Sequence, residues 1–187
     1  MSADRTTEEG QRLRSLAKRG TVEEFRTLYR PADATDSDLG PGLLFDALAQ
    51  KVPANRPIIA GMLLDDGADA GWEQPGGVTT LHVLLGQNKH DFAAETPLLR
   101  RLLDAGADLN RVSSRHGTPL ETIGKVFKFS EPEIAPFLDE IFDRDDLDLL
   151  KVSADGRTVL DNIRLYPRRP DLVARAEAYV KERGIDL

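Results

Sequence analysis

Two stretches of the chain nearly repeat each other: residues 63–72 read LLDDGADAGW, and residues 102–111 read LLDAGADLNR. Their glycines, Gly67 and Gly106, are 39 residues apart, and Gly184, in the closing stretch VKERGIDL, lies two further periods of 39 along the chain. A fixed internal period of this length is the signature of a protein built from stacked repeats. These stretches therefore predict a repeat architecture.

A second phrase recurs with the same period. It reads GVTTLHVLL around Leu81, HGTPLETI around Leu120 and GRTVLDNI around Leu160, and these leucines are 39 and 40 residues apart. Upstream, GLLFDALAQ places Leu44 37 residues before Leu81. Two markers that recur in the same order with one period are far harder to obtain by chance than a single marker.

Each of these phrases contains a threonine that suits a helix start. Thr80, Thr118 and Thr158 lie at or beside the first helical residue, where a threonine hydroxyl caps amide groups that lack a helical partner. Pro119 fits a first turn. Apolar residues then recur at helical spacing, and a second helix follows that ends at a glycine or, in the fourth repeat, near Asp143.

We therefore predict an all-α fold, a solenoid of about five stacked helix pairs joined by hairpin-like loops. The pairs are expected at about residues 8–30, 42–66, 79–105, 118–143 and 158–184, within a single repeat domain that covers residues 1–187. Each repeat is expected to run as helix, loop, helix and then an extended polar connection.

This pattern resembles the ankyrin-repeat family, whose repeats carry Gly-x-Thr-Pro-Leu-His and, later, Gly-Ala-Asp-x-Asn. The matching residues are Gly77, Thr79, Leu81, His82, Leu102, Leu103, Gly106, Ala107, Asp108 and Asn110, with Thr118, Pro119 and Leu120 as the best Thr-Pro-Leu. The resemblance implies an ankyrin-like solenoid that binds proteins through a concave face and loop tips. It also implies that His82 closes a hydrogen-bond net between neighbouring repeats.

The chain departs from the family in its period, which is about 33 residues in the family and 37–40 here. The surplus falls between the two helices of each pair, at residues 51–57, 86–97, 128–133 and 166–170. The histidine of the motif is replaced by Phe45, Glu121 and Asp161 in three copies. The alternative fold is a helical repeat with a longer period, of about 40–47 residues.

The composition excludes several classes of protein. The 187 residues include 25 Lys and Arg against 32 Asp and Glu, a net charge of −7, whereas nucleic acids and anionic membranes favour a positive field. Cysteine is absent, which excludes disulfides, a thiolate nucleophile and Cys-ligated zinc. No apolar window approaches the roughly 18 residues of a membrane span, and the charged N-terminus is not a secretory signal. We expect a cytoplasmic protein that binds neither nucleic acid nor membrane.

No constellation of residues points to catalysis. His82, His90 and His116 have no carboxylates at metal-ligand spacing. The acidic run at residues 143–148 lacks the central glycine and the twelfth-position glutamate of a calcium loop. No P-loop, Rossmann or Gly-x-Ser-x-Gly motif occurs. We therefore expect no enzyme activity, no catalytic residue, no metal and no cofactor.

The connections between repeats supply the candidate partner-binding residues. Tryptophan and arginine are enriched at the energetic centres of protein interfaces, and Trp72 is the single tryptophan. The candidates are Trp72, Glu73, Gln74, Arg111, Arg115, His116 and Asp155. The alternative role of Trp72 is packing against its own hairpin or the neighbouring one.

Charge is unevenly placed along each repeat. Most loop aspartates fall in the connections between repeats. The inter-helix insertions and their flanks instead carry Lys51, Arg56, Lys89, His90, Lys125, Lys128, Arg164, Arg168 and Arg169. We expect an acidic edge and a more basic opposite edge, although helix electrostatics alone explains part of this polarity. One of Phe127 and Phe129, which flank Lys128, is expected to face solvent.

The functional interpretation is a protein–protein interaction module that acts without chemistry. We expect a monomer that occupies a partner's surface, as an inhibitor or neutraliser of a toxin or enzyme does, and the acidic edge directs the search to basic partners. The alternative is a small enzyme or small-molecule sensor with a pocket among His90, Asp91 and Glu95 of the 86–97 insertion. A third interpretation is an assembly role in which end repeats stack between copies.

Overall fold

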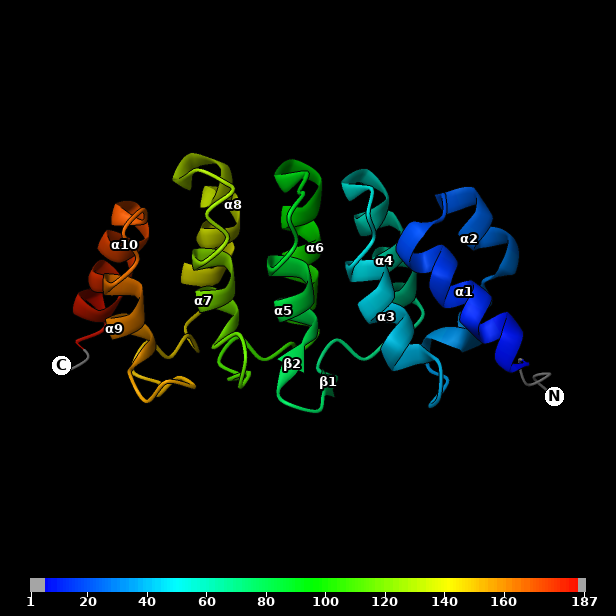
Figure 1. The fold of residues 1–187 in the computed structure, drawn as a ribbon, viewed down its shortest axis with the longest axis horizontal. Helices are drawn as coiled ribbons and strands as arrows, with labels where there is room; N and C mark the ends of the chain where they lie inside the picture. Colours follow the sequence, from blue (N-terminus) through cyan, green and yellow to red (C-terminus); the bar gives the residue numbers. More distant parts are fainter. Residues whose placement is uncertain (1–5, 185–187) are drawn as a thin grey trace. The chain divides into compact units, whose positions relative to one another are not determined.

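A computed structural model describes residues 6–184; residues 1–5 and 185–187, which the single-domain prediction also includes, lie outside the described part. The described residues form ten α-helices, two short 3-10 helices and one two-stranded sheet (Figure 1). The all-α prediction is therefore confirmed.

The helices are short. They are α1 (Thr7–Arg19), α2 (Val22–Leu28), α3 (Gly40–Leu48), α4 (Arg56–Asp65), α5 (Thr80–Leu85), α6 (Phe92–Asp104), α7 (Pro119–Gly124), α8 (Glu131–Phe142), α9 (Val159–Arg164) and α10 (Pro170–Glu182). The 3-10 helices are η1 (Pro31–Ala34) and η2 (Pro53–Asn55), and the strands are β1 (Glu73–Gln74) and β2 (Val78–Thr79). Isolated helices of such lengths are marginal in water, so their stability must come from packing.

The chain divides into two compact units. The first contains the described residues up to Trp72 together with Lys89–Ala107, and the second contains Glu73–Asn88 and the described residues from Asp108 onward. The expected helix pair at 79–105 is divided between them, since α5 belongs to the second unit and α6 to the first.

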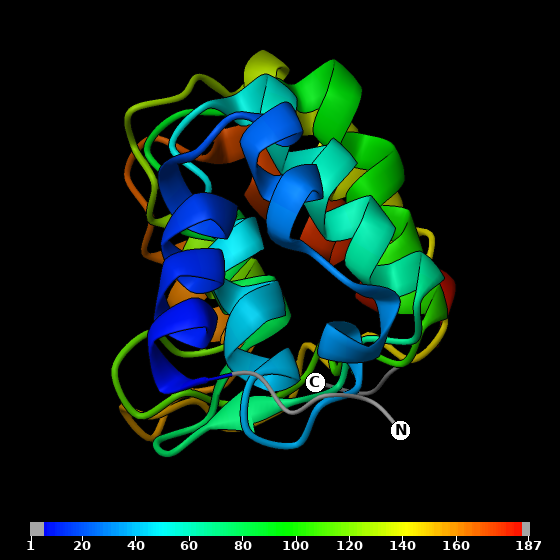
Figure 2. The same cartoon turned by 90° about the vertical axis from the view of Figure 1, so that its right-hand side faces the viewer.

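In the first unit, α1 lies against α3, and α4 lies against α2, α3 and α6. Figure 2 shows α1 beside α3 and α2 beside α4. The core of this unit contains Leu13, Phe25, Leu44, Leu63 and Leu99, none of which has exposed surface. The apolar residues that recur at helical spacing thus face one another between the helices.

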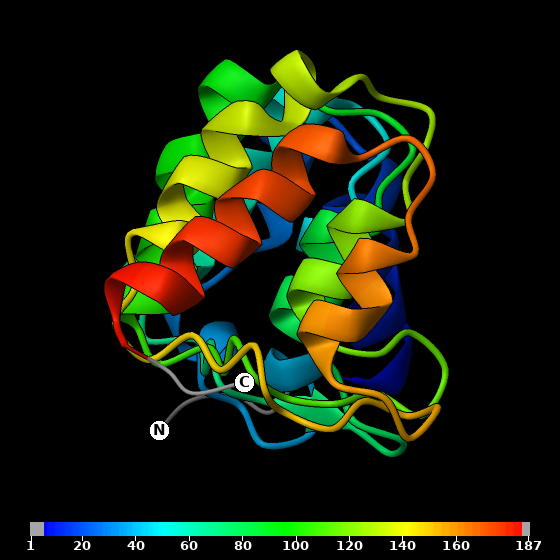
Figure 3. The ribbon, with the colours of Figure 1, turned by 90° about the vertical axis from the view of Figure 1, so that its left-hand side faces the viewer.

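In the second unit, α7 lies against both α5 and α9, and α10 lies against α8 and α9. Figure 3 shows α9 beside α7 and α10 beside α8. Leu81, Leu120 and Leu160, the leucines that recur in the sequence, are at most 1% exposed. The recurring leucine therefore marks the buried face of α5, α7 and α9.

Glycine follows three of the second helices, as predicted. Gly67 follows α4 with a φ of 89°, Gly106 follows α6 with 91°, and Gly184 follows α10 with 59°. A Cβ is disfavoured in this left-handed region, which explains the recurrence of glycine at these positions. In the fourth repeat, α8 ends at Phe142 and Asp143 is its C-cap, as expected.

Threonine begins the first helices of the second unit. The Thr118 and Thr158 hydroxyls accept hydrogen bonds from the N–H groups of Glu121 (3.3 Å) and Asp161 (3.1 Å). These bonds satisfy amide donors that have no partner inside the helix. In α5 the N-cap is Thr79, one residue before the Thr80 that begins the helix.

The connections in the second unit are hairpin-like. Antiparallel pairs join Glu73 to Thr79, Gln74 to Val78, Ser113 to Gly117 and Val152 to Thr158. The connection between α2 and α3, in the first unit, differs from the extended chain that was expected, because it contains η1. There Pro31 restricts φ, and the Asp33 carboxylate accepts a hydrogen bond from the Arg30 N–H (2.7 Å).

A buried arginine closes the C-terminal end of α7. The guanidinium of Arg169 is 1% exposed and donates hydrogen bonds to the carbonyl oxygens of Gly124 (3.0 Å), Val126 (2.8 Å) and Phe129 (2.9 Å). The last carbonyls of a helix have no intrahelical donor, and burying them unpaired is costly. Arg169, the N-cap of α10, therefore holds the loop that follows α7 in place.

Replacing Arg169 with methionine should destabilise the protein by about 3 kcal/mol or more, because each buried acceptor left without a donor costs about 1–3 kcal/mol. The measurement is the free energy of unfolding from urea denaturation. Arg168→Met is the matched control, since Arg168 is exposed and a surface substitution changes stability by no more than about 0.5 kcal/mol. Equal effects of the two substitutions would contradict the role given to Arg169.

Candidate partner-binding site

The seven predicted binding residues fall in both units. Trp72 belongs to the first unit, and the other six belong to the second. The half-buried Trp72 ring packs edge-on against Phe45 of α3, with ring centroids 4.8 Å apart. The ring thus contributes to the packing of the first unit, and its role in binding stays a prediction.

Glu73 and Arg111, in the second unit, neutralise each other. The Arg111 Nε and Nη2 atoms lie 2.5 Å and 2.7 Å from the two carboxylate oxygens of Glu73, a bidentate ion pair. Gln74, the neighbour of Glu73 in β1, is exposed. This arrangement joins the β1–β2 hairpin to the next connection along the chain.

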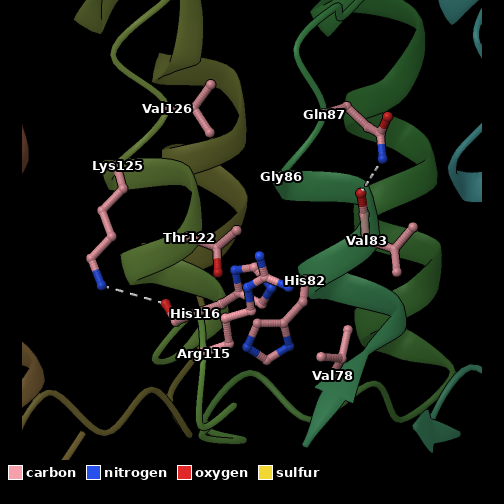
Figure 4. A pocket seen from close by; sticks show the side chains of 10 residues that line it. All are labelled: Val78, His82, Val83, Gly86, Gln87, Arg115, His116, Thr122, Lys125 and Val126. Atoms are coloured by element: carbon pink, nitrogen blue, oxygen red, sulfur yellow. Dashed lines mark hydrogen bonds between the residues drawn. The ribbon is translucent and has the colours of Figure 1, made fainter. Parts of the chain in front are cut away.

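Arg115 and His116 line a pocket of about 390 Å³ between α5 and α7. The lining residues are Val78, His82, Val83, Gly86, Gln87, Arg115, His116, Thr122, Lys125 and Val126. Figure 4 shows Arg115 and His116 near His82 at one end of the pocket, with Gln87 and Val126 toward the other end. Arg115 and His116, two of the predicted residues, thus share one concave site.

The repeat period explains how the pocket forms. Val83 of α5 and Thr122 of α7 are 39 residues apart, and so are Gln87 and Val126, which follow the two helices. Equivalent positions of successive repeats therefore line the same pocket. The leucines of the two helices face the core instead. Gly86, the C-cap of α5, also lines the pocket, and a Cβ there would lie only 2.9 Å from the His82 carbonyl oxygen and 3.4 Å from the Thr122 methyl group.

His82 holds the start of α5 against the next repeat. Its Nδ1 accepts a hydrogen bond from the Thr79 N–H (3.1 Å), so the ring proton lies on Nε2, which donates to the Gly117 carbonyl (2.8 Å). Burial lowers the pKa of His82, and the bond to Gly117 offsets only part of this effect. The ring is therefore neutral at pH 7, and these bonds support the hydrogen-bond net that the ankyrin resemblance implies.

Glu121 occupies the position of His82 in the following repeat and makes the same kind of bridge. Its buried carboxylate accepts hydrogen bonds from the Thr118 N–H (2.7 Å), the Ser153 hydroxyl (2.6 Å) and the Asn162 amide (2.9 Å). The first bond caps α7, and the other two reach the next connection and α9. Glu121 is thus fully engaged in holding the second unit together.

The two cations of the pocket are differently placed. The exposed guanidinium of Arg115 makes no hydrogen bond or ion pair with any described residue. The contacts of Lys125 are long: its Nζ lies 3.5 Å from the His116 carbonyl oxygen, 3.6 Å from the Glu121 carboxylate and 5.9 Å from the centre of the Tyr166 ring. Contacts of this length at an exposed ammonium contribute little to stability.

We expected Lys125 on the basic inter-helix edge, but the structure places it in the same pocket as Arg115. The reason for the difference is the length of α7, whose six residues span only about 9 Å. Helical side chains lean toward the N-terminal end, so Lys125, just after α7, reaches back to the loop that carries His116. The short spacing between Thr118 and the next loop was the signal in the sequence for this proximity.

Three cationic or titratable residues of the expected basic edge have buried side chains. Arg56 and Arg169 are each 1% exposed, and the His90 side chain has no exposed surface. They bond to carbonyl oxygens or to the buried Glu95, because loop polar groups inside the fold require partners. The basic edge is therefore smaller than expected.

Phe127 is 42% exposed, which confirms that one of the two loop phenylalanines faces solvent.

Asp155 lies in a second, smaller pocket of about 220 Å³ that Arg115 and Lys125 also line. The Asn162 amide donates to its carboxylate (3.0 Å), as do the N–H (3.1 Å) and guanidinium (3.2 Å) of Arg157. These hydrogen bonds lower the pKa of Asp155, with the bond from Asn162 as the largest cause. Arg115, His116 and Asp155 thus lie around the start of α7, as neighbours of the two pockets.

The residues of the alternative enzyme site are used as structural groups. The buried Glu95 carboxylate lies 2.6 Å from both Arg56 Nη1 and His90 Nδ1. Asp91 caps α6 by accepting a hydrogen bond from the Ala94 N–H (3.2 Å).

Among residues 6–184, no group of three His, Asp or Glu side chains is arranged to hold a metal ion. No helix in this range is long and apolar enough to cross a membrane.

Comparison with known proteins reveals a similarity of fold. No protein-family model matches the chain, and no curated protein matches it. The chain is similar to the crystal structure of a functionally unknown protein from Leptotrichia buccalis C-1013-b, with a TM-score of 0.73 and 23% sequence identity. The match covers 94% of this chain and 96% of that chain. At this identity the likeness concerns the fold alone.

Lowering the pH from about 7.5 to about 5.5 should destabilise the protein through His82. The unfolded chain binds a proton at His82 below pH 6.5, whereas the folded chain resists it because its pKa is lowered. The contribution of His82 to stability is therefore fully present above pH 6.5, and it is lost as the pH falls below that value. The free energy of unfolding from urea denaturation measures this effect.

His82→Gln is neutral at every pH and should remove this contribution, while costing about 2 kcal/mol at pH 7 through lost buried hydrogen bonds. The stability difference between wild type and variant should narrow toward about pH 5.5 and stay constant between about 7.5 and 8.5. A difference that stays constant over the whole range would mean that His82 does not titrate as described.

Proposed function

We propose that the protein is an ankyrin-like solenoid that works as a protein-interaction module and binds its partner at the loops and pocket around the start of α7. The observation that carries the proposal is the pocket between α5 and α7, where the predicted residues Arg115 and His116 lie together with the exposed Arg115 guanidinium unengaged. Exposed arginine at a concave site is typical of protein interfaces.

The use of the polar groups supports binding rather than chemistry. His82, Glu121 and Glu95 are buried titratable groups of the two candidate sites, and each one bonds to groups that hold helix starts or loops. A catalytic acid or base needs an open position for a substrate. The exposed side chains of Arg115 and His116 hold no helix start or loop in this way and remain available to a partner.

The ankyrin likeness is supported by several features of the units. Successive first helices bury the recurring leucine, hairpin-like connections follow one another in the second unit, and the His82 bridge joins neighbouring repeats. A repeat array of this kind binds over an extended surface. Within the proposal, the protein is a cytoplasmic monomer that occupies a partner's surface and thereby inhibits or neutralises a toxin or enzyme.

Affinity purification of the tagged protein from its source cell should recover a partner in about equal amount, identified by mass spectrometry. Arg115→Glu should weaken capture at least about tenfold, because it reverses a charge at the centre of the surface. Lys151→Glu makes the same charge change on an exposed side chain that lines neither pocket and should retain the partner. Recovery of chaperones alone would contradict the proposed function.

A further inference from the structure

We propose that the pocket between α5 and α7 binds an acidic segment of the partner protein, with a carboxylate held by Arg115 and Lys125 and an aliphatic side chain held between the valines. This inference rests on the proposed function and specifies the chemistry of the partner. It also reverses the sign expected from the net charge of the chain, which favoured basic partners.

The charge of the pocket is opposite to that of the protein. The chain carries a net charge of −7, yet none of the ten residues that line the pocket is Asp or Glu. Arg115 and Lys125 contribute two positive charges, and His82 is neutral because burial lowers its pKa. A carboxylate therefore meets two cations in the lining, while the nearby acids Glu121 and Asp155 belong to the adjoining pocket, where other side chains donate hydrogen bonds to them.

Both cations are exposed, and neither is held by a short ion pair. Arg115 has no ion-pair partner among the described residues. The Glu121 carboxylate, 3.6 Å from Lys125, already accepts three shorter hydrogen bonds and does not depend on that lysine. A guanidinium binds a carboxylate through two parallel hydrogen bonds, which gives both affinity and orientation.

The walls of the pocket suit an aliphatic neighbour of the acidic residue. Val78, Val83 and Val126 line the pocket together with the polar residues. The Gln87 amide donates to the Val83 carbonyl (2.7 Å), which orients its side-chain oxygen as an acceptor for a peptide N–H. A volume of about 390 Å³ is at the lower end for ligand pockets, enough for a few side chains of an extended segment.

The net charge favours a peptide carboxylate over a polyanion. A nucleic acid or a phosphorylated surface carries many charges and is repelled by the field of a −7 protein. A short acidic segment needs attraction only where Arg115 and Lys125 lie, within about a Debye length of 10 Å. The pocket thus selects the local sign of the partner's surface rather than its overall charge.

The test uses the purified full chain and labelled peptides in fluorescence anisotropy. The probe is an acetylated and amidated peptide of sequence GSEVELESG, compared with versions in which every Glu is Gln or every Glu is Lys. The Glu peptide should bind at least about tenfold more tightly than either, and its affinity should fall as salt is added. Equal or tighter binding of the Gln or Lys peptide overturns the inference.

Matched variants separate the pocket from the general charge of the protein. Arg115→Gln with Lys125→Gln should weaken binding of the Glu peptide at least about tenfold. Lys151→Gln with Arg168→Gln removes the same charge from exposed residues of the second unit that do not line the pocket, and should change binding less than about twofold. Circular dichroism checks that both variants fold, and equal losses in both overturn the inference.

Two further results distinguish the ligand and the proposed function. If N-acetylglutamate amide binds as tightly as the peptide, the pocket takes a small anion and the inference of a partner segment is wrong. If a partner recovered from the cell binds wild type and the Arg115→Gln, Lys125→Gln variant equally, the inference fails while the proposed function stands. If the peptides behave as expected but no partner is recovered, the proposed function fails instead.

Discussion

The second unit depends on a polar side chain that caps one short helix and bonds to the next repeat at the same time. His82 does this for α5 by joining Thr79 to Gly117, and Glu121 does it for α7 by joining Thr118 to Ser153. Helices of six residues have almost no stability alone. Because one side chain serves as both cap and bridge, the start of a helix forms together with the connection of the next repeat. The loops around the pocket are held in place by this coupling.

Much of the fold was predictable because it depends on local signals with a strict period. Threonine caps, leucine spacing and glycine after a helix each act within a few residues, so Thr118, Leu120 and Gly106 could be interpreted directly. The burial of Arg169 could not, because its partners are carbonyl oxygens that lie 40 to 45 residues earlier in the chain. A cation in a loop looks exposed unless the unpaired carbonyls it serves are already placed in space.

The site was predicted in part for the same reason. Arg115 and His116 were recognisable as loop residues, whereas Lys125 belongs to the pocket only because α7 is so short. The net charge favours a basic partner, whereas the proposed pocket favours an acidic segment, because net charge averages over surfaces that a ligand never meets together. Electrostatic attraction is screened within about 10 Å at moderate salt, so a ligand in the pocket responds to the charges around α7 rather than to acids elsewhere on the chain. Arg115 and Lys125 line the pocket itself, whereas Asp155 lies in the adjoining one.

In the second unit, the side chains that hold the fold together differ from those to which we assign recognition of a partner. His82, Glu121 and Arg169 are buried and bonded, while Arg115, Lys125 and His116 are exposed and contribute little to holding the fold. Under the proposed function, the surface around α7 is therefore free to evolve, because exchange of its exposed residues would alter the partner without lowering the melting temperature. The same separation makes the α5–α7 surface a scaffold whose ligand preference is open to redesign by a few substitutions.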